Sequence, residues 1–307
     1  MGRASKDKRD MYYRKAKEEG YRARSAYKLL QIDESFHIFD GVTRAVDLCA
    51  APGSWSQVLA TRLPENLAKA KAAAADDADA TAALAEEECR IVAVDLQDMA
   101  PIPGVRIFQG DITTTATADK IISLLGCKAQ LVVCDGAPDV TGLHELDEYV
   151  QHQLLLAAQN ISTFVLAPGG TFVAKIFRGP NTPFLCAKLQ LFFRDVTVVK
   201  PKSSRNASME SFVLCQGYQP PEGFVPSMFD PLTLEHGFEE GTINATFAPF
   251  LACGSLDGFD ADACYVARAV EEAGGDAAAP AARAATAGND YREAVRATME
   301  AYADSAA

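Results

Sequence analysis

The sequence predicts an α/β fold in which a mostly parallel sheet is covered by helices on both faces. Short apolar runs alternate with amphipathic or helix-forming stretches from about residue 43 to residue 217. Most of these runs are apolar throughout, which is typical of strands buried on both sides. The last two runs are joined by a short loop, so we expect an antiparallel hairpin at an edge. In such sheets ligands bind beyond the carboxyl ends of the strands, where the strand order reverses.

Each element follows from its own residues. The predicted strands are short runs rich in valine, isoleucine and phenylalanine, at residues 44–49, 90–96, 105–109, 129–135, 170–177, 195–201 and 210–218. The stretches between them have the length and pattern of helices, at residues 53–63, 117–125, 143–166 and 182–192. Together they predict seven strands with helices between them.

Two alanine-rich segments fall outside this pattern. Residues 66–88 form an Ala/Asp/Glu-rich insert, for which we expect a marginal helix or disorder. Residues 268–307 form an Ala-rich tail that we expect to be partly disordered, although 291–302 are compatible with one helix. Neither segment carries a recognisable functional motif, so we expect the functional residues within a single domain, residues 1–267.

Composition narrows the class of protein. The chain has 307 residues, of which 49% are hydrophobic and 23% charged, enough to bury a large core. No stretch approaches the roughly 18 apolar residues that span a bilayer, and no apolar segment follows the charged N-terminus, so we expect neither membrane insertion nor secretion. The eight cysteines include no C-x-x-C pair, which disfavours a zinc site or a redox dithiol. We expect a cytoplasmic protein with reduced thiols and no metal.

The charge is unevenly distributed. The net charge is −12, but residues 1–30 hold ten lysines and arginines against four acids, with four tyrosines among them. Cations for phosphates beside rings for unstacked bases are typical of single-stranded RNA sites. A solvated helix face whose tyrosines pack on the protein body is the alternative. A smaller basic cluster comprises Lys200, Lys202 and Arg205, whereas residues 219–307 hold four arginines and fifteen acids and are unsuited to bind a polyanion.

The loop after the first predicted strand indicates a cofactor site. The segment DLCAAPGSWSQVL, residues 47–59, runs from a strand through a loop into a helix. It has one glycine, whereas NAD and FAD folds use a G-x-G-x-x-G loop, so those cofactors are disfavoured. The helix N-terminus suits a smaller anion, such as the carboxylate of an amino-acid-like cofactor, and Gly53 would allow a close approach.

Acidic residues stand at the ends of the next strands. Asp95 after the second strand is placed to accept the hydroxyls of a ribose, and Asp111 after the third to accept an adenine amino group. Asp135 ends the fourth strand. Carboxylates around a pocket suit a cofactor with positive charge, such as the sulfonium of S-adenosylmethionine, better than a polyphosphate.

These motifs resemble a known family. Residues 5–33 and 47–59, together with VVCDGAPDVTG, TFVAKIFRG and SSRNASMESFVLCQGY, are similar to the FtsJ (RrmJ) family of S-adenosylmethionine-dependent RNA ribose 2′-O-methyltransferases. The segments at 225–237 and 249–265 resemble the cytosolic tRNA anticodon-loop branch, with 219–267 as its C-terminal extension and 1–35 as basic RNA-binding helices. The resemblance implies a Rossmann-like class I methyltransferase fold with a seven-stranded, mostly parallel sheet and an antiparallel edge strand.

The resemblance also assigns residues. It implies a catalytic Lys-Asp-Lys-Glu tetrad at Lys28, Asp135, Lys175 and Glu210. The implied cofactor contacts are Gly53, Trp55, Asp95, Asp111 and Asp135. Taken singly, Lys28 could equally be a phosphate contact, and Glu210 could pair with Arg205 or Lys202 at the surface.

The implied reaction is methyl transfer to the ribose 2′-hydroxyls of tRNA nucleotides 32 and 34, the first anticodon-loop position and the wobble position. The implied partners are tRNA, a large helical-repeat protein and a WD-repeat protein. Alternatives are an rRNA or mRNA-cap 2′-O-methyltransferase, or a non-catalytic RNA-binding assembly factor of the same fold. For the mechanism, either neutral Lys175 takes the hydroxyl proton or a protonated lysine pair stabilises the alkoxide, and the sequence leaves both open.

Overall fold

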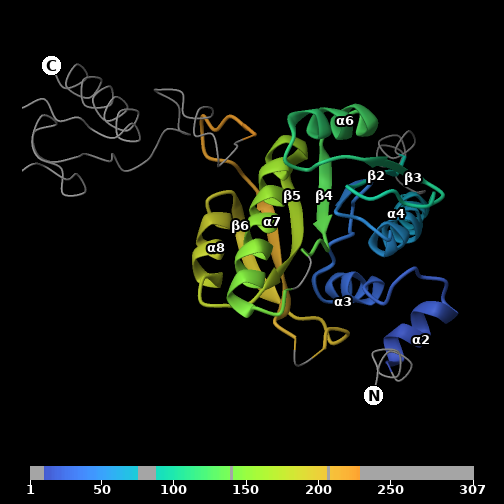
Figure 1. The fold of residues 1–307 in the computed structure, drawn as a ribbon. Coiled ribbons are helices and arrows are strands. Elements are labelled where there is room, and N and C mark those ends of the chain that lie inside the picture. Colours follow the sequence, from blue (N-terminus) through green and yellow to red (C-terminus); the bar gives the residue numbers. More distant parts are fainter. Residues whose placement is uncertain (1–9, 75–87, 139–140, 206–207, 229–307) are drawn as a thin grey trace, which may run out of the picture. The chain divides into compact units, whose positions relative to one another are not determined.

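The computed structural model of the chain describes residues 10–74, 88–138, 141–205 and 208–228, all within one compact unit (Figure 1). The predicted 268–307 tail, most of the 219–267 extension and most of the 66–88 insert lie outside the described residues. The first nine residues of the basic segment lie outside them as well.

The described residues form the predicted α/β fold around one seven-stranded sheet. Its strand order is β3-β2-β1-β4-β5-β7-β6, with β1 to β5 paired in parallel and β7 antiparallel to both neighbours. The strands comprise β1 Arg44–Leu48, β2 Arg90–Asp95, β3 Val105–Gln109, β4 Ala129–Cys134, β5 Leu166–Phe177, β6 Phe193–Val199 and β7 Glu210–Tyr218. The predicted antiparallel hairpin is present: β7, the last strand of the described residues, lies between β5 and β6, so that β6 is the edge strand.

Helices cover both faces of the sheet (Figure 1). They comprise α2 Met11–Glu18, α3 Ala26–Phe36, α4 Ser54–Ala73, α6 Thr115–Leu125, α7 His144–Val165 and α8 Thr182–Leu189. Helices α6, α7 and α8 bury their apolar residues against one face, where Leu155 of α7 belongs to the same core as Val132 and Phe172. Helices α3 and α4 pack on the other face in a core that includes Leu29 and Phe212. This two-sided burial explains why the strands are apolar throughout.

Three element boundaries differ by three residues or more from the sequence-based expectation. Helix α4 passes through Pro64 and ends at Ala73, ten residues beyond the predicted end. A proline removes one main-chain donor, but residues 65–73 are rich in strong helix formers, which carry the helix into the alanine-rich insert. Strand β5 begins at Leu166, four residues early, and α8 ends at Leu189, three residues early.

The tyrosines of the basic N-terminal segment pack against one another. The ring centroid of Tyr27 lies 5.4 Å from that of Tyr12 and 5.8 Å from that of Tyr21, and Tyr27 is buried. Asp10 caps the N-terminus of α2, since its carboxylate accepts hydrogen bonds from the main-chain N–H groups of Tyr12 and Tyr13. These three rings therefore serve the packing of α2 on α3, as the packing alternative predicted.

None of the helices in the described ranges is long and apolar enough to cross a membrane.

Candidate active site

A large pocket lies at the carboxyl ends of β1, β2 and β4, where the strand order reverses. Its volume is about 1080 Å³. Its walls come from the loops after these strands and from one side of α7, including Ala51, Pro52, Asp95, Met99, Thr113, Asp135, Gly136, Val150 and Leu154. This is the position that the sequence predicted for a cofactor.

Asp95 is fixed at the pocket wall by the main chain around it. Its Oδ2 accepts a hydrogen bond from the N–H of Ala51 at 2.8 Å, and its Oδ1 accepts one from the N–H of Gln97 at 2.8 Å. The carboxylate thus joins the loop after β1 to the loop after β2. Each oxygen keeps a further lone pair, so the group can still accept hydroxyl donors from a ligand.

Gly53 shapes the turn between the loop and α4. Its φ is +102°, in the region that favours glycine, and it is the N-cap of α4. A Cβ there would lie 2.8 Å from Nη1 of Arg22 and 2.8 Å from Cδ1 of Ile102. Because Arg22 lines the pocket and donates to the carbonyls of Pro52 and Pro101, each at 2.9 Å, the missing side chain admits a guanidinium at the helix N-terminus.

Two other predicted cofactor contacts lie differently. Trp55 is 2% exposed, its indole N–H donates to the carbonyl of Ser25 at 2.9 Å, and its ring packs 5.6 Å from that of Phe212. Asp111 is exposed and holds Thr113, whose N–H it accepts at 2.9 Å and which lines the pocket. Neither Trp55 nor Asp111 is among the described pocket-lining residues, and their contact with a cofactor stays a prediction.

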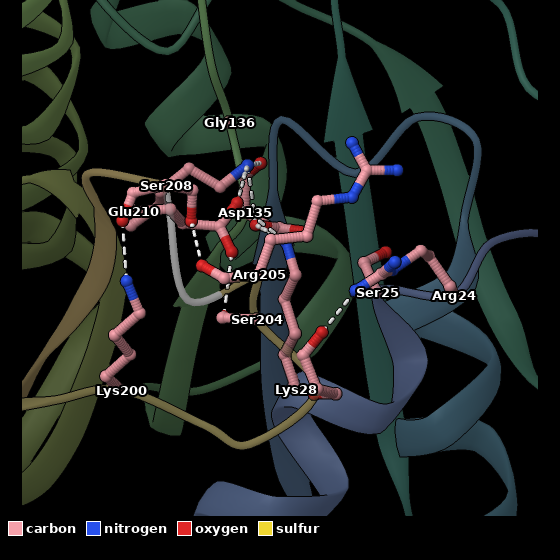
Figure 2. A network of polar contacts seen from close by, with 12 residues as sticks. Arg24, Ser25, Lys28, Asp135, Gly136, Lys200, Ser204, Arg205, Ser208 and Glu210 are labelled. Carbon is pink, nitrogen blue, oxygen red and sulfur yellow. Dashed lines mark hydrogen bonds and ion pairs between the residues drawn. The ribbon is translucent and has the colours of Figure 1, made fainter. Parts of the chain in front are cut away.

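The four residues of the predicted tetrad lie together beside this pocket. Lys175 Nζ is 2.7 Å from Asp135 Oδ1 and 3.9 Å from Glu210 Oε2. Lys28 Nζ is 2.8 Å from Glu210 Oε2 and 3.9 Å from Asp135 Oδ1. Figure 2 shows Lys28, Asp135 and Glu210 converging from separate segments of the chain. The two lysines and two acids form one cluster in which each lysine faces both carboxylates.

Four different elements deliver these side chains. Lys28 is on the first turn of α3, Asp135 directly follows β4, Lys175 is in β5 and Glu210 begins β7. Both lysines are buried, with 8% of each residue exposed. Glu210 pairs with the two lysines through one oxygen, and its second oxygen accepts from Ser204 Oγ at 2.9 Å. Buried charges of this kind persist because they are paired.

The cluster sets the protonation of its members. Burial lowers the pKa of Lys175, but the carboxylates of Asp135 and Glu210 outweigh burial, so this pKa lies above its ordinary value. Burial raises the pKa of Glu210, but the Lys28 and Lys175 ammonium groups together bring it below its usual range. Lys175 is therefore protonated and Glu210 ionised at neutral pH in the protein alone.

The loop between β6 and β7 closes against the N-terminal segment next to the tetrad. The Arg24 guanidinium pairs with Asp10 and donates to the carbonyl of Ser203. Arg205 lies 3.9 Å from Asp10, and Lys200 donates to the carbonyl of Ser208 at 2.5 Å (Figure 2). The two basic clusters of the sequence thus border the same site.

Sequence reasoning missed several residues of this site. Arg22 stood among ten N-terminal cations, and no pattern distinguished it from the others. Ser204 lies in a loop without periodicity, and the Val150 and Leu154 side of α7 looks like ordinary core. Within the described ranges, no group of three or more histidines, cysteines, aspartates or glutamates is placed to hold a metal ion.

The sequence is similar to those of known methyltransferases. The chain matches the family of FtsJ-like methyltransferases over residues 21–218. It is 55% identical over 272 residues to a human tRNA (cytidine(32)/guanosine(34)-2′-O)-methyltransferase, covering 86% of this chain and 76% of the relative. The Schizosaccharomyces pombe protein of that name is 55% identical over 266 residues, covering 86% and 88%.

A solved structure with a similar fold is that of a ribosomal RNA methyltransferase from Plasmodium falciparum. The TM-score is 0.52 at 25% sequence identity, covering 64% of this chain and 98% of the other. The similarity extends over almost the whole of that smaller protein, so it supports the methyltransferase fold for the sheet and the helices that cover it.

Proposed function

Because the chain belongs to the FtsJ-like methyltransferase family, we propose that it transfers a methyl group from S-adenosylmethionine to the ribose 2′-hydroxyls of tRNA nucleotides 32 and 34. The observation that carries this proposal is the position of Asp135, which lines the pocket and also contacts Lys175 of the tetrad. A methyl donor in the pocket and a hydroxyl at the tetrad would then meet at one residue. Such positioning is a large part of the acceleration of a displacement reaction.

The pocket has the chemistry that the cofactor requires. When bound, S-adenosylmethionine supplies the methyl group from a positively charged sulfonium. Asp95 would accept the ribose hydroxyls, Arg22 at the N-terminus of α4 would bind the carboxylate, and Asp135 would favour the positive charge. The apolar residues Met99, Val150 and Leu154 offer a surface for the adenine. Gly53, Trp55 and Asp111 remain proposed contacts on the basis of the family resemblance.

Lys175 is the proposed general base. Its amine would take the proton of the 2′-hydroxyl, which makes the oxygen a competent nucleophile. Since the pKa of Lys175 is raised in the protein alone, the ammonium must first lose a proton. Lys28, paired with Glu210, would stabilise the developing negative charge on the oxygen, while Asp135 and Glu210 hold both lysines in place.

The tRNA assignment rests on the relatives and on the charge of the site. Relatives at 55% identity from human and fission yeast are named for nucleotides 32 and 34 of tRNA. Exposed cations of the N-terminal helices and of the loop before β7, among them Lys15, Lys17 and Lys202, would be available to RNA phosphates. Exposed cations suit a phosphate backbone despite the net charge of −12.

Nucleoside mass spectrometry of hypomodified tRNA tests the proposal. The purified protein, alone and together with the helical-repeat and WD-repeat proteins that the family resemblance implies, is incubated with tRNA and labelled S-adenosylmethionine, and the 2′-O-methylated nucleosides are mapped. Label confined to nucleotides 32 and 34, lost in Lys175→Ala and retained in Lys188→Ala, is expected, because Lys188 is exposed on α8 away from the tetrad. No label in tRNA even with these partners would refute the substrate assignment, and full label with Lys175→Ala would refute the residue assignment.

Two alternatives share this fold. Relatives at 38–39% identity are named rRNA methyltransferases, so rRNA and capped RNA belong in the same assay, and label in these alone would overturn the tRNA assignment. A non-catalytic RNA-binding factor is disfavoured because a scaffold has no need for two buried lysines paired with two acids.

The proposed reaction involves partner proteins and a cellular compartment. We propose that a large helical-repeat protein and a WD-repeat protein select the site, and that the reaction takes place in the cytoplasm. Co-purification of the tagged chain and fractionation of cells test both. Activity at both nucleotides by the chain alone would remove the need for such partners.

A further inference from the structure

The pairing between strands β4 and β5 ends just before two residues of the tetrad. The parallel ladder between β4 and β5 ends at the pair Cys134 and Ala174. Asp135 and Lys175 each lie one residue beyond this pair. The ladder itself therefore does not fix the separation of their main chains, although Lys175 Nζ must reach both Oδ1 and the carbonyl of Asp135, at 2.7 and 2.8 Å.

One side chain from α7 bridges the two segments at this point. Gln151 is 1% exposed, and its Nε2 donates to the carbonyl of Gly136 at 3.1 Å and to the carbonyl of Lys175 at 3.1 Å. An amide NH₂ has two hydrogens, so one group can serve both carbonyls at once. The carboxamide thus continues the connection between the strands beyond the last ladder pair.

The partner on the β4 side is held tightly as well. A Cβ on Gly136 would lie 2.7 Å from Cβ and 3.0 Å from Sγ of Cys49, so the chain after Asp135 runs close against the loop that follows β1. Gly136 is drawn next to Asp135 in Figure 2. Because Gly136 has little room to move toward Cys49, a change in the bridge would be taken up mainly by the segment at Lys175, and the Asp135 to Lys175 contact would be displaced.

We infer that Gln151 is a positioning residue for methyl transfer, which holds Asp135 and Lys175 at their working separation without touching cofactor or RNA. The expected effect of Gln151 on kcat rests on the proposed function, whereas its expected effect on the Asp135 to Lys175 contact rests on the geometry alone. The two halves are tested separately, so that a failure of one can be told from a failure of the other.

The first test replaces the donor while keeping the length of the side chain. Gln151→Met retains the volume but offers no N–H, which leaves two buried carbonyls without their partner. We expect kcat to fall roughly 10- to 100-fold, the range that small misplacements of catalytic groups produce. The dissociation constant of S-adenosylmethionine, measured by calorimetry, should change less than twofold. The control Gln159→Met removes another buried glutamine two turns along α7 and should keep kcat within twofold.

Gln151→Glu supplies a readout that a merely structural role would not move. An ionised carboxylate would face two carbonyl oxygens, whereas the protonated acid can donate to one of them. The ratio of variant to wild-type kcat should therefore rise as pH falls from 8 to 6. Each kcat is normalised to the concentration of cofactor-binding sites and measured well below the melting temperature. A ratio that stays flat, or a Gln151→Met enzyme within twofold of wild type, would overturn the inference.

A third measurement does not depend on methyl transfer. The ζ-nitrogen of Lys175, labelled with ¹⁵N and identified with Lys175→Arg, gives an NMR signal that reports its two contacts with Asp135. This signal should move in Gln151→Met and stay in place in Gln159→Met. If the wild-type protein methylates no RNA but the Lys175 signal moves in Gln151→Met, the proposed function is refuted and the positioning role of Gln151 is retained. If the signal does not move in Gln151→Met, the positioning role is refuted whatever the activity.

Discussion

Replacing Asp47 by asparagine should change how the stability of the protein depends on pH. Asp47 lies in β1, is 1% exposed, and accepts a hydrogen bond from Ser56 Oγ at 2.5 Å, while its Oδ1 is buried without a hydrogen-bond partner. The pKa of this carboxyl is raised from 3.8 to about 7, chiefly by burial. The folded state therefore holds a proton between pH 4 and 7 that the unfolded chain has released.

The sign and the size follow from this difference. The contribution of Asp47 to stability falls as pH rises from about 4 through 7. It levels off above pH 7, where Asp47 is ionised in both states and the cost of the buried charge reaches about 4 kcal/mol, at 1.36 kcal/mol per pKa unit. Asparagine has no such dependence. The stability of Asp47→Asn relative to wild type should therefore increase by about 2.5 kcal/mol between pH 5 and pH 8. Any constant effect of the new amide cancels in this comparison.

Urea denaturation at pH 5, 6, 7 and 8 measures this difference. The chain has one tryptophan, the buried Trp55, so its fluorescence follows the unfolding of the unit that contains Asp47. Asp119→Asn, at an exposed position on α6, is the control and should run parallel to wild type. A difference between Asp47→Asn and wild type that stays constant from pH 5 to pH 8 would show that the carboxyl is ionised throughout and would refute the reasoning.

Three further predictions concern the site. Because the pKa of Lys175 is raised, log kcat/KM for methyl transfer should climb with a slope near one from pH 7 to pH 9, as the neutral amine forms. Glu210→Gln removes one of the charges that raise this pKa, so the climb should shift to lower pH while the maximal rate falls, measured in the same assay. Gly53→Ala should cost about 1–3 kcal/mol in urea denaturation and weaken binding of S-adenosylmethionine in calorimetry, because φ is +102° and the new methyl meets Arg22.

Each of these has an outcome that contradicts it. A flat pH profile would remove neutral Lys175 from the mechanism and favour a protonated lysine pair. An unshifted profile for Glu210→Gln would mean that this carboxylate does not act on Lys175. For Gly53 the matched control is Gly104→Ala, where φ is +79° but no atom lies within 4 Å of the new Cβ. Equal losses in both variants would leave only the backbone cost and exclude the clash with Arg22.

The sheet could be predicted closely because burial on both faces leaves a direct trace in the sequence. Six strand starts follow the apolar runs within two residues, whereas β5 begins four residues early, at Leu166. The segment LAPGG looks like a turn, but Leu166 pairs with Ala129 beyond a register shift in the ladder. The end of α4 was missed for a related reason: Pro64 is a local signal to stop, and the helix-forming residues after it outweigh that signal.

The site could be predicted in its charges but not in their connections. The four tetrad residues were assigned by resemblance, and the structure brings them together. What no local pattern contains is the direction of a side chain from a helix: Trp55 donates to Ser25 and packs against Phe212, and Gln151 donates to two carbonyls. Such contacts depend on how α4 and α7 are rotated on the sheet, which periodicity fixes only for apolar residues.

The place of β7 bears on when the protein becomes competent during its synthesis. Lys28 and Glu210 are 182 residues apart in the chain, and among the described residues β6 joins the sheet through β7, the strand that follows it. A nascent chain on the ribosome can therefore assemble β1 to β5, but β6 has no place to dock and the lysines lack one of their two acids until residue 218 has emerged. Catalytic competence should thus appear abruptly and late in translation, so that unfinished chains remain inert toward RNA.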